Sequence, residues 1–308
     1  MAIGEEQCTL VMHPAVRKQN TIRREACLTG VSLFHGFESR VRLLPAGAGH
    51  GIVFRRVDVR EKPEMPARCH YLAKEPRRTV LQSVTGVRVE TVEHLMAALA
   101  GLQVDNCIVE IDAPEVPSFD GSSRAFCDAI LEAGIEAQDA DCPMHCVSEV
   151  LAVQSSDRRQ SLVARPYIFR CLSVTYHLDY GRRAVLPPQS LSVEISPEYF
   201  YEHLAAARTF VLESEIKALR QMGFGKHLTT KDIVVVGENG ILDNQLRWSD
   251  EGVRHKILDC VGDLALCGRQ ICGHITACRS GHHLNHELAG LFSSGVRNRD
   301  SANAQYAA

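Results

Sequence analysis

The chain has 308 residues, of which 45% are hydrophobic, enough to bury the core of one large or two ordinary domains and to argue against a disordered scaffold. The formal net charge of -3 leaves no basic excess of the kind that nucleic-acid binding requires. No basic leader precedes an apolar core at the N-terminus, and no segment reaches the roughly 18 apolar residues of a membrane span. We therefore expect a cytoplasmic protein without membrane insertion.

The first half of the chain alternates short strand-like segments with turns rich in Pro and Gly. Residues 39–44 and 51–57 predict strands on either side of PAGAGHG. Apolar residues then recur at helical spacing over about three turns, with Thr91 placed to cap the start and Gly101 to end the regular part. The run NCIVEIDAP predicts a further strand, and residues 123–133 predict a second helix.

The second half repeats the same order of elements. Residues 137–146 (AQDADCPMHC) are polar, contain Pro and carry no period, so they predict a domain boundary, and strands follow over 148–195. The later elements are helices over 197–204 and 212–222, the strand IVVVGENG, a helix over 250–266, the strand HITACRS and the helix HLNHELAGLFSS. This order predicts an α+β protein with an N-terminal domain over 1–140, a C-terminal domain over 147–296 and a frayed tail over 297–308.

The 12 cysteines are scattered through the chain without any C-x-x-C pair. Several of them, such as Cys107 and Cys260, lie within apolar runs. A disulfide framework is typical of small secreted chains, so we expect reduced, buried thiols instead.

One predicted helix, RHKILDCVGDLALCG, carries polar side chains on a single face. His255 and Asp259 are four residues apart and Asp263 continues the face, a pattern that also suits an exposed polar helix surface. A catalytic zinc takes three protein ligands. His94 is the candidate third donor, although a lone His in an apolar helix is usually a satisfied core histidine. The adjacent Glu93 favours the metal interpretation, because a carboxylate beside a ligating His can take a proton from the metal-bound water.

The segment SGHHLN lies where a predicted strand ends and a helix begins, a place from which a side chain can enter a cleft. Taken by themselves, His282 and His283 are better explained as loop or cap histidines than as catalytic residues. An amide hydrolase, however, needs an acid to protonate the departing amine, and a His held by a carboxylate such as Asp263 is suited to that role.

Five segments occur in order along the chain: TVEHLMAALAGLQVDN, EVPSFDGSS, ARTF, VRHKILDCVGD and SGHHLN. Together they resemble UDP-3-O-acyl-N-acetylglucosamine deacetylase, over a stretch from Thr21 to Leu288. The resemblance implies hydrolysis of the acetamide of a UDP-linked, acylated amino sugar, the committed step of lipid A synthesis in Gram-negative bacteria. It also implies two α+β domains, each a sheet with two helices, packed with the helices between the sheets.

The resemblance implies roles for particular side chains. A zinc ion would be held by His94, His255 and Asp259. Glu93 would be the base that activates water at the zinc, and His282 would be the acid, oriented by Asp263. The hydroxyl of Thr209 in ARTF would face the developing oxyanion. Two imidazoles and a carboxylate also suit Fe²⁺.

The resemblance also implies residues that contact the substrate. Lys256 would lie beside the sugar or the diphosphate, and Arg279 would face the diphosphate. The acyl groove would be lined by Leu33, Phe210, Leu212 and Ile216. Next to the first of these, the TGVGLHTG of the family stands here as TGVSLFHG, so Phe34 and His35 replace a His-Thr pair.

Two other interpretations remain open. The metal centre would serve any acetamide, so a deacetylase for a different N-acetyl sugar is the first alternative. A non-catalytic binding protein of the same fold is the second, and it would be expected to have lost Glu93 or His282, which are both present. For the enzyme we expect a UDP-linked acylated amino sugar as partner, no nucleic acid, and a monomer.

Overall fold

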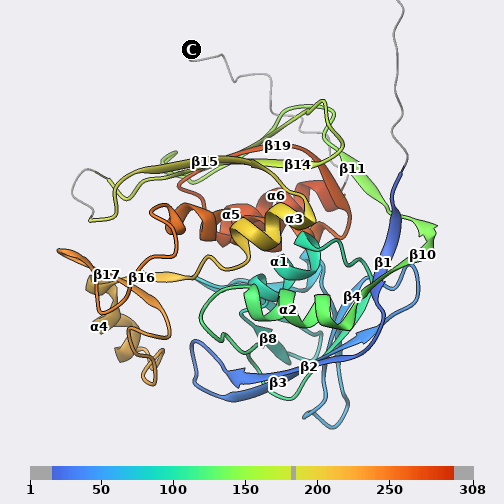
Figure 1. The fold of residues 1–308 in the computed structure, drawn as a ribbon, viewed down its shortest axis with the longest axis horizontal. Helices are drawn as coiled ribbons and strands as arrows, with labels where there is room; N and C mark the ends of the chain where they lie inside the picture. Colours follow the sequence, from blue (N-terminus) through green and yellow to red (C-terminus); the bar gives the residue numbers. More distant parts are fainter. Residues whose placement is uncertain (1–15, 182–184, 295–308) are drawn as a thin grey trace, which may run out of the picture.

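The computed structural model describes residues 16–181 and 185–294. Figure 1 shows helices enclosed between two sheets. The N-terminal sheet has the strand order β2 (Ala26–Val31), β3 (Glu38–Pro45), β9 (Cys107–Ile111), β4 (Ile52–Arg56) and β5 (Glu64–Pro66). Its strands pair antiparallel except for β4 and β9, which run parallel. The helices α1 (Glu93–Gly101) and α2 (Arg124–Ala133) accompany this sheet.

The second sheet lies on the opposite side of the helices. Its order is β12 (Leu151–Gln154), β13 (Ser161–Arg165), β19 (Gln270–Cys278), β14 (Leu172–Leu178) and β15 (Gln189–Glu194), with β11 (Met144–Cys146) also pairing with β19. Its helices are α5 (Glu251–Leu264) and α6 (His282–Ser294). The predicted α+β class with helices between the sheets is confirmed.

Smaller elements surround these layers. One three-stranded sheet contains β6 (Leu72–Ala73), β7 (Val80–Gln82) and β8 (Arg88–Glu90). Another contains β16 (Phe210–Leu212), β17 (Val234–Gly237) and β18 (Gly240–Ile241), and it projects to one side together with α4 (Glu213–Gln221) (Figure 1). The short helices are Cys69–Tyr71, α3 (Pro197–Tyr199), the π-helix Phe200–Leu204 and Ala265–Cys267.

The contact between α1 and α5 positions the site described below. Leu95 and Leu99 on α1, and Ile257 and Leu258 on α5, are fully buried. At Gly262 a Cβ atom would stand 2.2 Å from the carbonyl oxygen of Glu93, so a side chain at this position would push the two helices apart. Glycine thus permits the close approach that brings residues from the two halves of the chain together.

Residues 137–146, which we predicted as an irregular boundary, instead contribute to two strands. β10 (Ile135–Asp141) pairs with β1 (Lys18–Ile22), and β11 follows after a short turn. β10 belongs to a two-stranded sheet with little burial on either face, so no alternation of apolar residues marks it in the sequence. The domain limits 1–140 and 147–296 stay predictions, and the predicted tail over 297–308 lies outside the described residues.

Two local expectations were wrong. Thr91 does not cap α1: its φ is +58° and its hydroxyl donates to Glu115 Oε1 at 3.0 Å, while Val92 precedes the helix without a side-chain cap. Not every thiol is buried either, because Cys27 and Cys146 are exposed. Cys107 and Cys260 are buried and free, as expected. Among the described residues, no helix is both long and apolar enough to cross a bilayer.

Candidate metal centre and active site

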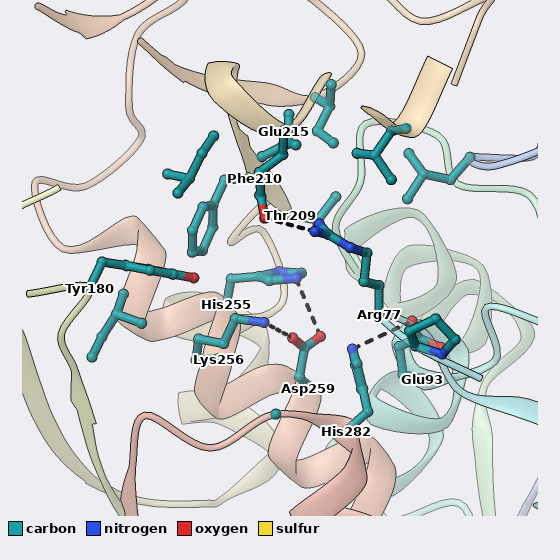
Figure 2. A pocket seen from close by; sticks show the side chains of 18 of the residues that line it. Arg77, Glu93, Tyr180, Thr209, Phe210, Glu215, His255, Lys256, Asp259 and His282 are labelled. Atoms are coloured by element: carbon teal, nitrogen blue, oxygen red, sulfur yellow. Dashed lines mark hydrogen bonds and ion pairs between the residues drawn. The ribbon is translucent and has the colours of Figure 1, made fainter. Parts of the chain in front are cut away.

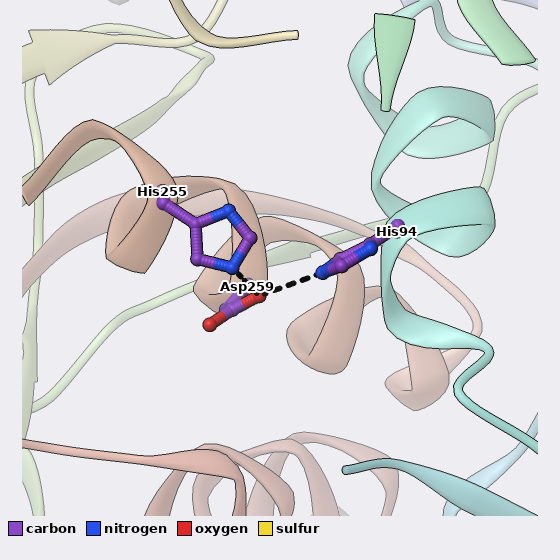
Figure 3. Close-up of side chains that lie close together, drawn as sticks. All are labelled: His94, His255 and Asp259. Carbon is purple, nitrogen blue, oxygen red and sulfur yellow. Dashed lines mark ion pairs between the residues drawn. The ribbon is translucent and has the colours of Figure 1, made fainter. Parts of the chain in front are cut away.

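Three predicted ligands from two helices converge in the interior (Figure 3). His94 extends from α1, and His255 and Asp259 extend from α5, one turn apart. The distance to Asp259 Oδ1 is 3.6 Å from His94 Nε2 and 3.2 Å from His255 Nε2. The ligand atoms of all three residues lie within 4.8 Å of one another, and all three side chains are buried. This geometry could hold one metal ion.

The protonation states of Asp259 and His255 suit the binding of a cation. Within the described part of the chain, Asp259 Oδ1 is buried without a hydrogen-bond donor, an arrangement that is costly unless a cation compensates it. His255 Nδ1 donates to the carbonyl oxygen of Ala207 at 3.0 Å, which leaves the lone pair of Nε2 directed at the cluster. Burial lowers the pKa of His255 to about 3, so the ring is neutral, as a metal ligand must be.

Lys256 contacts the same carboxylate on its other oxygen. The ammonium donates to Asp259 Oδ2 at 2.8 Å and lies 5.8 Å from the ring centre of Phe210. Burial alone would raise the pKa of Asp259, but the facing His255 and Lys256 hold that pKa well below its usual value. The carboxylate is therefore ionised and available as a ligand.

Glu93 lies beside the metal cluster at the first turn of α1. Its Oε2 accepts a hydrogen bond from the backbone N–H of Thr79 at 3.0 Å. Its Oε1 is 4.0 Å from His282 Nε2. Burial raises the pKa of Glu93. The carboxylate and the imidazole therefore face each other across a short gap next to Asp259, as Figure 2 shows.

A second cluster surrounds Asp263, one turn further along α5. Its Oδ2 lies 2.8 Å from His282 Nδ1 and accepts from Asn285 Nδ2 at 2.9 Å. Its Oδ1 accepts from Thr79 Oγ1 at 2.5 Å and lies 3.2 Å from His286 Nε2. Burial alone would lower the pKa of His282, but Asp263 raises it to about 9. The ring is therefore protonated at neutral pH.

Three members of this cluster were missed from the sequence: Thr79, Asn285 and His286. His286 is four residues after His282 in one helix, the same spacing that singled out His255 and Asp259, so this signal was available. Thr79 carried no signal, because only the folded chain brings it to Asp263.

Both clusters border a cavity of about 940 Å³ (Figure 2). Its walls include all four residues predicted for the acyl groove: Leu33, Phe210, Leu212 and Ile216. Thr209 and Lys256 also line it, close to the metal cluster. Arg279 lines it as well, and its guanidinium forms an ion pair with Asp179. Figure 2 also shows Arg77 reaching Glu215 of α4, with 2.7 Å between Nη2 and Oε1.

Phe34 and His35, which depart from the family pattern, take different positions. Phe34 lines the cavity, and its ring packs edge-on against Phe224 with 5.4 Å between ring centres. The guanidinium of Arg78 lies 4.5 Å from the ring centre of Phe34. His35 Nε2 lies 3.2 Å from Glu90 Oε2. The substituted loop is therefore fixed against the segment that follows α4.

Comparisons with known proteins agree with one another. The sequence model of a family described as UDP-3-O-acyl N-acetylglycosamine deacetylase matches residues 19–293. A relative in Myxococcus xanthus is 39% identical over 279 residues, which cover 90% of this chain and 87% of the relative. Relatives in a Geobacter species and in Idiomarina loihiensis are 38% and 37% identical, each over 88% of this chain and over 87% and 88% of their own lengths. All three carry the name UDP-3-O-acyl-N-acetylglucosamine deacetylase.

Proposed function

Because this chain belongs to the UDP-3-O-acyl N-acetylglycosamine deacetylase family, we propose that it hydrolyses the acetamide of UDP-3-O-acyl-N-acetylglucosamine in lipid A biosynthesis, using zinc. The products are the UDP-3-O-acyl-glucosamine and acetate. The observation that carries this proposal is the unpartnered Asp259 Oδ1 between two imidazoles, beside Glu93 and at the wall of a large cavity.

The residues present fit the ion that the family implies. His94, His255 and Asp259 would hold it, and a neutral His255 with an ionised Asp259 needs no further proton loss to bind. Zinc held there supplies Lewis acidity, which lowers the pKa of water and polarises the acetamide carbonyl. Fe²⁺ would suit the same donors. Because these donors suit both metals, the choice of zinc rests on the family resemblance.

Glu93 is the general base in this proposal. The backbone N–H of Thr79 holds one carboxylate oxygen and leaves the other facing the gap toward His282. As water attacks the carbonyl carbon, Glu93 takes its proton. The raised pKa of Glu93 brings its basicity closer to that of the proton it must accept.

His282 is the general acid. Its Nδ1 faces Asp263 at 2.8 Å, so the proton at Nε2 is the one directed toward the cavity and Glu93. When the carbon–nitrogen bond breaks, that proton passes to the amine nitrogen and the amine leaves. A pKa of about 9 keeps this proton in place at neutral pH. Thr209 lies in the same wall, where its hydroxyl would donate to the developing oxyanion.

The cavity accounts for the substrate class. Apolar side chains of Leu33, Phe210 and Leu212 offer a surface for an acyl chain, while Lys256 and Arg279 offer positive charge for a diphosphate. A cavity of about 940 Å³ exceeds what an acetamide sugar alone would need. The cytoplasmic location and the monomeric state stay predictions.

Acetate release tests the proposal directly. We expect metal-stripped protein to be inactive and to regain activity with one equivalent of Zn²⁺, and UDP-3-O-acyl-N-acetylglucosamine to be hydrolysed far faster than UDP-N-acetylglucosamine. Glu93→Gln is the matched control, because it leaves all three ligands intact and should keep the metal while losing activity. Equal rates with and without the acyl chain would favour the alternative deacetylase. Failure of Zn²⁺ and Fe²⁺ to restore any activity would reject the metal mechanism.

A further inference from the structure

His286 is a second imidazole on the carboxylate that holds the acid, and nothing in the reaction described above uses it. Its Nε2 lies 3.2 Å from Asp263 Oδ1 and 2.9 Å from Thr79 Oγ1. His282 occupies the other carboxylate oxygen, Oδ2, at 2.8 Å. The two rings lie on one face of α6, with 6.2 Å between their centres. His286 does not line the cavity that borders His282.

The partners of His286 determine which nitrogen carries its proton. Thr79 has one hydroxyl hydrogen, and the 2.5 Å contact assigns that hydrogen to Asp263 Oδ1. The remaining groups around His286 Nε2 are acceptors, so Nε2 carries a hydrogen that Thr79 Oγ1 and Asp263 Oδ1 share. Asp263 therefore accepts from four donors: Thr79, His286, Asn285 and His282.

Asp263, His282 and His286 also have ligand atoms within 4.8 Å of one another, as a metal site would. The four hydrogen-bond donors to Asp263 distinguish this cluster from a metal site. Both oxygens of Asp263 have donors, whereas Asp259 Oδ1 has none. A cation would have to displace the hydrogens of Thr79 and His286. The cluster is arranged to hold protons.

We propose that His286 is a positioning residue for the deacetylation: together with Thr79 it engages Asp263 Oδ1, keeps Oδ2 aimed at His282, and limits how tightly the carboxylate holds the proton of the acid. This inference rests on the proposed role of His282. A carboxylate whose charge is shared among more donors attracts any one proton less. Loss of the His286 donor should therefore strengthen the hold of Asp263 on His282, the opposite of losing Asp263 itself.

Other charged groups around the two rings are few. Glu93 on α1 and Asp259 on α5 act on His282 in addition to Asp263. Cys69, in the short helix packed against α6, lies near Asp263. Within residues 16–181 and 185–294, the ion pairs of His282 are with Glu93 and Asp263, and that of His286 is with Asp263. Among these charged groups, Asp263 is therefore the one that both rings share. The neutral Thr79 Oγ1 also lies near both rings, 3.4 Å from His282 Nδ1 and 2.9 Å from His286 Nε2.

The test is His286→Leu, chosen because leucine fills the space without admitting a replacement water. The pH at which kcat falls on the basic side should rise by about half a unit, since His282 then keeps its proton longer. KM should stay within about twofold, because His286 does not reach the substrate cavity. His286→Gln is the matched control: its amide can donate to Asp263 Oδ1, so it should restore the wild-type profile.

A second measurement does not depend on activity. Nitrogen NMR of the metal-loaded protein, with the His282 signal assigned from its loss in His282→Gln, should show the same upward shift of the His282 titration in His286→Leu. If wild-type protein releases no acetate, the proposed function fails, and the NMR shift still decides this inference. An unchanged or lowered His282 titration overturns it. So does a second bound metal ion that is lost in His286→Leu.

Discussion

Asp259 and Asp263 lie one turn apart on α5, and each faces two imidazoles, but the two carboxylates differ in their hydrogen-bond donors. The Asp259 cluster contains a buried carboxylate oxygen without a donor, and both facing nitrogens are Nε2 atoms. The Asp263 cluster has donors on both carboxylate oxygens, from Thr79 and Asn285 among others. Nearly the same set of side chains therefore supports two chemistries.

The two clusters differ in the hydrogen-bond donors that face each carboxylate. Around Asp259, the proton of His255 is turned away toward the Ala207 carbonyl, so the lone pair of His255 Nε2 faces Asp259 Oδ1, and a cation between them would compensate both. Around Asp263, hydroxyl, amide and imidazole donors all turn inward. Residue type alone thus does not identify a metal site. The direction of each N–H and O–H does.

The largest expected effect on metal binding and activity comes from neutralising the carboxylate of Asp259. Asp259→Asn should abolish both the bound metal and acetate release, because the amide loses the negative charge and directs hydrogens at the imidazoles. Metal per chain, measured by mass spectrometry of purified protein, checks this. Full metal occupancy in the double variant His94→Ala/His255→Ala would contradict the assignment of the cluster.

Removing the acid should leave the metal in place. His282→Ala is expected to lower kcat by about two to four orders of magnitude, the range of general acid catalysis, with metal content near that of the wild type. The fall of kcat near pH 9, which marks loss of the imidazolium proton, should disappear. If the wild-type rate and basic limb both persist, the acid is another residue, and His283 at the same cavity is the next to examine.

Asp263→Asn should show an intermediate effect with a defined sign. Burial lowers the pKa of His282, but Asp263, with smaller contributions from Asp259 and Glu93, raises it to about 9. Loss of the Asp263 charge therefore lowers that pKa and moves the basic limb of kcat to lower pH. Metal content should not change, because Asp263 is not among the three converging ligands. A kcat profile measured between pH 5 and pH 10 checks the direction. A limb that stays in place would exclude Asp263 as the partner of the acid.

The smallest effect is expected away from both clusters. Leu33→Asp places a charge on the wall of the cavity and should raise KM for the acylated substrate, while metal content and the pH profile stay as in the wild type. The measurement compares the acylated with the non-acylated UDP-sugar. If the preference for the acyl chain is unchanged, the loop that carries Leu33 does not contact that chain.

Helical periodicity in the sequence was enough to align His255, Asp259 and Asp263 on one face, because residues four apart share a face whatever the tertiary structure. Ile257 and Leu264 of the same helix are fully buried in the core. The meeting of His94 with that face was implied by the family resemblance. It depends on the approach of two helices, which residue spacing does not encode.

Features created by packing were missed for that reason. Thr79 reaches Asp263 from a distant loop. The ion pair of Lys256 with Asp259 is a different case, because the two residues are three apart on one helix and that spacing was visible in the sequence. Thr91 was predicted as a helix cap from its type, but its positive φ and its bond to Glu115 exclude it from that role. The strand over Ile135–Asp141 is exposed to solvent on much of its surface, so its sequence lacks the alternation of apolar and polar residues that marks most strands.

If an ion binds where α1 and α5 converge, as proposed, it has a consequence for the stability of the chain as a whole. His94 and His255 are separated by more than half of the 308 residues, so an ion bound to both works as a removable cross-link that closes a very long loop. Closing loops of about 100 residues or more removes unfolded-state entropy worth about 5 kcal/mol in the chain-entropy model. Binding of the ion would therefore stabilise the contact between the two halves of the molecule.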